Sequence, residues 1–126
     1  MGKTTEAREQ RSLVAYLRNR SLIFWHTPNQ LAARTRRKGA INKALGVVAG
    51  VPDIVIASPV HRRPEVRGVG IEMKGPGGKL SDAQRRMAVV LQSCGWLTYV
   101  CWSAEEAKAV VRDLWPEDLD GQDPGV

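Results

Sequence analysis

The sequence has little of several features that would place it in a specialised class of protein. Its two cysteines, Cys94 and Cys101, lie in no CxxC or His-rich pattern, so neither a zinc site nor a disulfide framework is predicted. The longest stretch without a charged residue, 87–104, contains glycine and several polar residues and is not a membrane span. The first residues include no apolar segment of the secretory type. We expect an intracellular protein with both thiols reduced.

Positive charge is the feature that the sequence has in excess. The 126 residues carry a net charge of +6, yet residues 116–126 hold four acids and no base, so the rest of the chain has 19 bases against 9 acids, or +10. Five bases crowd into one segment: Arg34, Arg36, Arg37, Lys38 and Lys43. We predict one domain over residues 1–115, followed by an acidic, disordered tail. A body this basic favours binding to phosphate backbones, although a solvated cationic surface without a partner is the alternative.

The pattern of apolar residues predicts alternating helices and strands. Helices are expected over 5–18, 82–94 and 103–114, and strands over 21–27, 51–57, 69–73 and 96–102. Residues 30–50 are expected to form a long loop with about one helical turn near 40–45. The short connection 58–68 predicts an antiparallel hairpin, and the strand–helix–strand step after it predicts a parallel pair. The fold class is α/β: a small mixed sheet flanked by helices, in the order αβββαβ with a further C-terminal helix.

Two acids interrupt the apolar central strands of this predicted sheet. Asp53 lies in Gly50-Val-Pro-Asp-Ile-Val-Ile, and Glu72 lies in Val69-Gly-Ile-Glu-Met-Lys. Because alternate residues of a strand face the same side, Glu72 and Lys74 project together, and Asp53 joins them if its strand is the hairpin partner. Two carboxylates so close favour a bound Mg²⁺ or Mn²⁺, with the main-chain carbonyl of Met73 as a further candidate ligand.

Each of these motifs also has a purely structural interpretation. Pro-Asp is common where a strand begins, and Glu-x-Lys is often an ion pair on a solvated face. The combination indicates more, because a charge on a buried strand is costly unless it is paired or functional.

The combined pattern resembles the PD-(D/E)XK nuclease superfamily, and the wider sequence is similar to the VRR-NUC domain in the short stand-alone form of phages and bacteria. The similarity covers roughly residues 5–111. It rests on four stretches of sequence. The first is an opening helix with Glu6 and Gln10, and the second is Phe24-Trp-His-Thr-Pro-Asn followed by a basic stretch that ends at Gly-Val-Pro-Asp53. The third is Gly70-Ile-Glu-Met-Lys74, and the fourth is Gly78-Lys-Leu-Ser-Asp-Ala-Gln84 with Gly95-Trp96.

The resemblance implies a restriction-endonuclease-like core and a Mg²⁺- or Mn²⁺-dependent deoxyribonuclease. It also implies a location in the cytoplasm of a bacterium or of the host of a phage. By the same resemblance, Asp53 and Glu72 bind the metal, Lys74 positions or activates the attacking water, and Gln84 lines the site. An acid on the first helix completes the set.

Three of the candidate site residues leave alternatives open. Glu6 is preferred on the first helix, but Glu9 lies one turn away and could take its role. Gln84 forms a capping box with Ser81 and could simply close the start of its helix. For His26, a contact with DNA or a hydrogen bond in the core is favoured over a role as general base.

The predicted substrate is DNA. Contacts are expected from a set of polar and basic residues, namely His26, Asn29, Arg34, Arg36, Arg37, Lys38, Lys43, Lys79 and Ser81, with Arg62, Arg63 and Arg67 as further backbone contacts. Contacts of this kind do not read base sequence, so selectivity for branched or four-way (Holliday) junction DNA is expected. The resemblance to stand-alone members implies the same selectivity. A symmetric junction needs two cuts, which favours a homodimer.

Two rival functions accompany this prediction. The first is a non-catalytic DNA-binding accessory module for packaging or recombination, which would bind DNA without any need for a divalent metal. The second is a metal-independent RNA nuclease, which is disfavoured because Tyr16 and Tyr99 have no evident histidine partner.

Overall fold

The computed structural model describes residues 2–28 and 36–119, which form four helices, four strands and a short 3₁₀ helix within those ranges. In chain order these are α1 (Gly2–Asn19), β1 (Phe24–His26), α2 (Arg36–Ala44), β2 (Ile54–Ile56), β3 (Val69–Met73), α3 (Asp82–Ser93), β4 (Leu97–Cys101), α4 (Ala104–Leu114) and η1 (Glu117–Leu119). The predicted α/β order is confirmed, with α2 as an additional element. None of the described helices has the length and apolar character needed to cross a bilayer.

The four strands form one mixed sheet in the order β1-β2-β3-β4. Strand β2 is antiparallel to β1 and to β3, with Ile54 opposite Ile71 in the second pair. Strands β3 and β4 are parallel and end with Met73 opposite Cys101. The predicted hairpin and the predicted parallel pair are therefore both confirmed.

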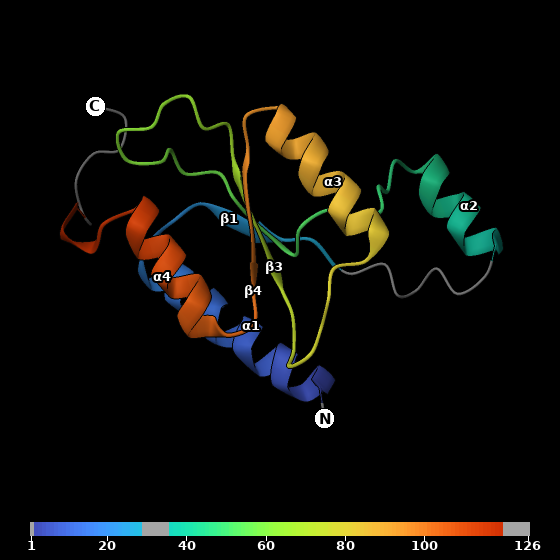
Figure 1. The fold of residues 1–126 in the computed structure, drawn as a ribbon, viewed down its shortest axis with the longest axis horizontal. Helices are drawn as coiled ribbons and strands as arrows, with labels where there is room; N and C mark the ends of the chain where they lie inside the picture. Colours follow the sequence, from blue (N-terminus) through green and yellow to red (C-terminus); the bar gives the residue numbers. More distant parts are fainter. Residues whose placement is uncertain (1, 29–35, 120–126) are drawn as a thin grey trace.

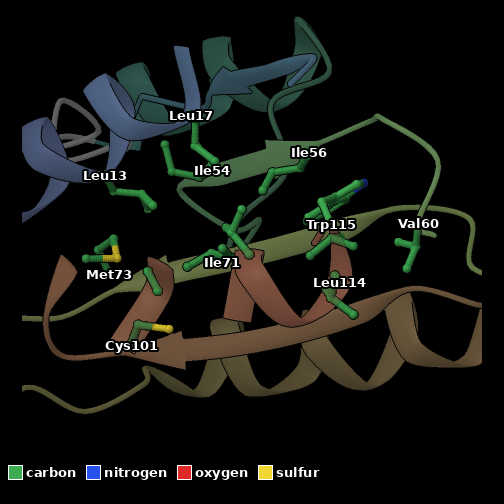
Figure 2. Packing of buried hydrophobic residues seen from close by; sticks show 13 residues of the cluster. Leu13, Leu17, Ile54, Ile56, Val60, Ile71, Met73, Cys101, Leu114 and Trp115 are labelled. Atoms are coloured by element: carbon green, nitrogen blue, oxygen red, sulfur yellow. The ribbon is translucent and has the colours of Figure 1, made fainter. Parts of the chain in front are cut away.

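The two faces of the sheet are covered differently. One face packs on α1 and α4, which lie side by side (Figure 1). The apolar core lies between these two helices and the sheet. It includes Leu13, Leu17, Ile54, Ile56, Ile71, Met73, Cys101, Leu114 and Trp115 (Figure 2). Helix α3 covers the opposite face, and none of its residues is fully buried. The second face is consequently the more open one.

Helices α1 and α4 are joined by polar contacts as well as by the core. The carboxylate of Glu9 accepts a hydrogen bond of 3.0 Å from the main-chain N–H of Ala104, at the start of α4. Further along, the Tyr16 hydroxyl donates to Glu117 in η1 over 2.6 Å. The first residues of the predicted acidic tail are thus bound to α1, and residues 120–126 lie outside the described part of the chain.

Helix α2 differs from the expected loop. The sequence predicts about one helical turn near 40–45, whereas the helix has nine residues and begins at Arg36. Arginine, lysine and alanine favour helix locally, although nine residues alone are marginal in water. Helix α2 lies at one extreme of the long axis of the molecule, apart from the sheet (Figure 1). Ile41 and the following Leu45 are exposed there.

Strands β1 and β2 are shorter than predicted, and the change at β2 affects the site. Ser21 adopts a positive φ of 56°, so the chain turns before β1 can begin. Asp53 lies one residue before β2 and not inside it. The preceding Gly50 has a φ of 85°, and a side chain there would collide with the main-chain carbonyl of Ala83. Glycine therefore lets the segment before Asp53 approach the first turn of α3.

Candidate active site

Two carboxyl groups meet where β2 begins and β3 ends. Extending the β2–β3 register by one residue places Asp53 opposite Glu72, and each residue is only 7% exposed. Oδ2 of Asp53 accepts a hydrogen bond of 3.0 Å from the main-chain N–H of Met73. The Nζ atom of Lys74 lies 3.8 Å from Oε2 of Glu72, and both side chains are largely buried. The structure thus brings together the three residues that the sequence predicts as one cluster.

The two acids strongly affect each other. Burial, together with a hydrogen bond to the Asp53 carboxyl and its negative charge, raises the pKa of Glu72 to about 9, and the Lys74 ammonium only partly opposes this. Glu72 therefore keeps a proton at neutral pH when no cation neutralises the pair. Neighbouring carboxylate oxygens are the ligands that hard divalent cations prefer, so the pair fits Mg²⁺ or Mn²⁺.

The pair is small for a metal site. Among the described residues, no third His, Cys, Asp or Glu joins Asp53 and Glu72 to make a larger cluster. Mg²⁺ commonly binds through one or two carboxylates and keeps several waters or substrate phosphates. The donor set therefore suits a cation that shares its shell with substrate.

The structure distinguishes the two acids of α1. Glu9 holds the N-terminus of α4 through Ala104, which gives it a structural contact. Glu6 lies one turn earlier and is half-buried. Among the described residues neither acid joins Asp53 and Glu72 in one cluster, so Glu6 as the additional acid of the site stays a prediction.

The capping role that the sequence leaves open for Gln84 is present in the structure. The side-chain oxygen of Gln84 accepts a hydrogen bond of 2.8 Å from the main-chain N–H of Ser81. The main-chain N–H of Gln84 in turn donates to the Ser81 hydroxyl, so the capping box is complete. Gln84 also lines a cavity of about 30 Å³ together with Glu72, beneath α3. Capping therefore fixes Gln84 beside a cavity that Glu72 also lines.

His26 supports the main chain that carries Asp53. Its Nδ1 atom lies 3.0 Å from the main-chain oxygen of Asp53 and 3.1 Å from Nε2 of Gln10 on α1. A protonated Nδ1 donates to the carbonyl, and an unprotonated Nδ1 accepts from the amide. This geometry matches the hydrogen-bonding alternative for His26, although the ring is exposed and open to other contacts.

The predicted DNA-contacting residues are only partly described. Lys43, Lys79 and Ser81 are exposed, as are Arg62, Arg63 and Arg67. The turn at residues 75–78 comes immediately after Lys74, and Lys79 follows that turn. Asn29 and Arg34 lie outside the described residues, and for Arg36, Arg37 and Lys38 the structure gives only the helical main chain of α2.

Trp102 borders this site and was overlooked in the sequence. The Lys74 N–H donates to the Cys101 carbonyl over 2.9 Å, which continues the parallel ladder, so Trp102 follows at the same edge as Lys74. Its indole N–H donates to the Gly78 carbonyl over 2.8 Å. The signal that could have identified it is the predicted parallel pairing of strands 69–73 and 96–102, because the ends of paired parallel strands meet at one edge of the sheet. Burial raises the pKa of the Cys101 thiol to about 11, which disfavours the thiolate that a nucleophile needs.

Comparison with known proteins agrees with this fold. Residues 4–105 match the family description of the VRR-NUC domain, which covers most of the chain. A solved structure described as a VRR_NUC domain protein is similar over 88% of both chains, with a TM-score of 0.72 and 20% sequence identity. No curated protein matches the sequence.

The raised pKa of Glu72 predicts how replacing it affects stability. Between its ordinary pKa of 4.5 and about 9, the folded state holds a proton that the unfolded chain has lost, so this residue lowers stability as pH rises. In metal-free buffer, Glu72→Gln should stabilise the protein by about 1–2 kcal/mol near pH 8 and by almost nothing near pH 5. Thermal unfolding across this pH range measures the difference. The exposed Glu65→Gln change is the control, and a Glu72→Gln effect independent of pH would contradict the assignment.

Proposed function

Because the chain belongs to the VRR-NUC family of nuclease domains, we propose that it is a divalent-metal-dependent endonuclease that hydrolyses phosphodiester bonds in DNA. The observation that carries this proposal is the buried Asp53–Glu72 pair with the Lys74 ammonium beside it. Burying two acids against each other destabilises the fold, which is expected where the pair serves to hold a cation.

The residues of the cluster have distinct proposed roles. A Mg²⁺ or Mn²⁺ ion held by Asp53, Glu72 and the main-chain carbonyl of Met73 would polarise a phosphoryl oxygen and lower the pKa of a bound water. Lys74 holds the attacking water and offsets the negative charge that develops on the phosphate. The side-chain oxygen of Gln84 is engaged by Ser81, which leaves its amide N–H groups free to orient toward the reacting phosphate.

Binding of DNA is proposed to occur along the basic surface around this cluster. Lys79 and Ser81 lie closest in the chain to Lys74, and Lys43 on α2 extends the positive surface away from the sheet. Such contacts hold phosphates and carry no base sequence information. We therefore propose selectivity for DNA structure, with branched or four-way (Holliday) junction DNA as the preferred substrate.

Removing the Lys74 ammonium tests the catalytic role. With Mg²⁺ or Mn²⁺ present, wild-type protein should cut four-way-junction DNA, and Lys74→Ala should reduce kcat by about 10²- to 10⁴-fold because charge stabilisation is lost. Lys79→Ala is the matched control from the adjacent turn, and it should mainly raise KM, by a factor that becomes smaller as the salt concentration rises. Cleavage is measured on labelled linear, nicked, flap and junction DNA of related sequence.

Several results of this assay would contradict the proposal. Equal cleavage by the wild-type and Lys74→Ala proteins would remove Lys74 from the chemistry. Salt-dependent DNA binding without any cleavage would establish the accessory module for packaging or recombination. Cleavage of linear duplex as fast as of the junction would exclude junction selectivity.

A homodimer is proposed because the more open face of the sheet carries an apolar groove. The groove has a volume of about 320 Å³ and is lined mainly by apolar residues of β1, β2, α3 and the segments after α2 and α3, among them Trp25, Val48, Val51, Val55, Leu91 and Trp96. Trp25 and Val48 are each 51% exposed, and Val90 of α3 is equally exposed. Contiguous apolar surface of this kind marks an interaction site, and a second copy would bring two active sites to one junction.

Charge placed in the groove should separate such a dimer. Val48→Glu is expected to shift the protein from dimer to monomer at micromolar concentration, since a carboxylate would be buried in the interface. Ile23→Glu, which alters an even more exposed residue outside the groove, should leave the dimer intact. Light scattering coupled to size-exclusion chromatography measures the mass, and a monomeric wild-type protein would exclude the dimer.

A further inference from the structure

Trp102 is held at the edge of the candidate active site by contacts at both of its N–H groups. The main-chain N–H donates to Oε2 of Glu106 over 3.0 Å, and the indole N–H donates to the carbonyl of Gly78 over 2.8 Å. Despite these contacts, Trp102 is 43% exposed. Since its only polar side-chain group is already bonded, the surface that it presents to solvent is ring carbon.

The contact with Gly78 links Trp102 to Lys74. Gly78 closes a turn by donating its N–H to the Gly75 carbonyl over 2.9 Å. A side-chain carbon placed on Gly78 would lie 3.2 Å from Cβ of Lys74, so the turn packs directly on that residue. Trp102, the turn and Lys74 therefore form one contiguous group, and the exposed ring lies next to the residues assigned to the scissile phosphate.

A fixed, exposed aromatic ring beside a phosphate-binding residue has a specific chemical use. Nucleobases stack on aromatic side chains, and little entropy is lost when the ring is already held in place. In a continuous duplex every base is stacked between its neighbours, whereas at a flap, nick or branch a terminal base is available. A ring at this position thus discriminates interrupted DNA from continuous duplex without reading sequence.

From this geometry we propose that Trp102 stacks on an unpaired nucleobase next to the scissile phosphate and so determines selectivity for interrupted DNA. The inference rests on the proposed nuclease function and adds the part of the substrate that the site recognises. It differs from a purely structural role, in which Trp102 would only support the turn at residues 75–78.

The test removes the stacking partner from the DNA as well as from the protein. Binding is measured in chelator, where no cleavage occurs, to a flap DNA and to the same DNA with an abasic nucleotide at the branch. Wild-type protein should bind the intact flap about 5- to 100-fold more tightly than the abasic one. Trp102→Leu should bind both equally, and Trp102→Phe, which keeps a ring but loses the N–H, should retain most of the difference.

The control variant is Ile23→Ala, which removes an exposed apolar side chain outside the groove, just before β1 at the opposite edge of the sheet, and should keep the full difference. A wild-type protein that binds both flaps equally, or a Trp102→Leu protein that still distinguishes them, would overturn the proposal. Should Trp102→Leu fail to fold, as judged by circular dichroism, the wild-type and Trp102→Phe comparisons decide alone.

Failure of the nuclease function itself would be seen separately. The same DNAs are incubated with Mg²⁺ or Mn²⁺, and cleavage is recorded apart from binding. Base-dependent binding without cleavage would reject the nuclease and retain the stacking role of Trp102. Cleavage without base-dependent binding would retain the nuclease and reject the stacking role of Trp102.

Discussion

The contact between the Asp53 and Glu72 carboxyl groups is the constraint on which the rest of the site depends. Two acids buried against each other repel when both are ionised, and burial makes that repulsion stronger because little water screens it. The protein retains a proton on Glu72 when it has no cation, with Lys74 as the nearest compensating charge. A divalent cation removes the need for that proton, so the same arrangement that lowers stability creates a binding site.

The surrounding fold holds this contact from three directions. The Met73 N–H fixes the Asp53 carboxylate, and His26 supports the main-chain carbonyl of the same residue. Gly50 lets the preceding segment approach α3, whose capping residue Gln84 lines a cavity together with Glu72. Helices α1 and α4 meanwhile bury the opposite face of the sheet and are joined at the strand ends by Glu9. The buried apolar layer therefore supports a more open face on which the Asp53–Glu72 pair lies.

Much of this arrangement follows from the sequence because the relevant signals are local. Strand β3 matches its predicted bounds, since a short apolar run is flanked there by glycine and charged residues. The proximity of Asp53, Glu72 and Lys74 follows from the hairpin register and the two-residue period of strands. Their catalytic roles stay predictions that the cleavage assay tests.

Other features depend on contacts that no local pattern records. Helix α2 lacks the apolar periodicity of a packed helix, so its nine residues were not predicted. The bond from Met73 N–H to Asp53 and the bond from the Trp102 indole to Gly78 join segments distant in sequence. The bond from the Ala104 N–H to Glu9 likewise joins α1 to the start of α4 across a long stretch of chain.

The most direct test of this account is calorimetric titration of Mn²⁺ into the protein near pH 7.5, in two buffers of different ionisation enthalpy. Because Glu72 is protonated without a cation, binding should release about one proton per ion, and Asp53→Asn should weaken the binding substantially. Mn²⁺ that binds without proton release, or equally well to Asp53→Asn, would show that the two carboxyl groups do not form the cation site.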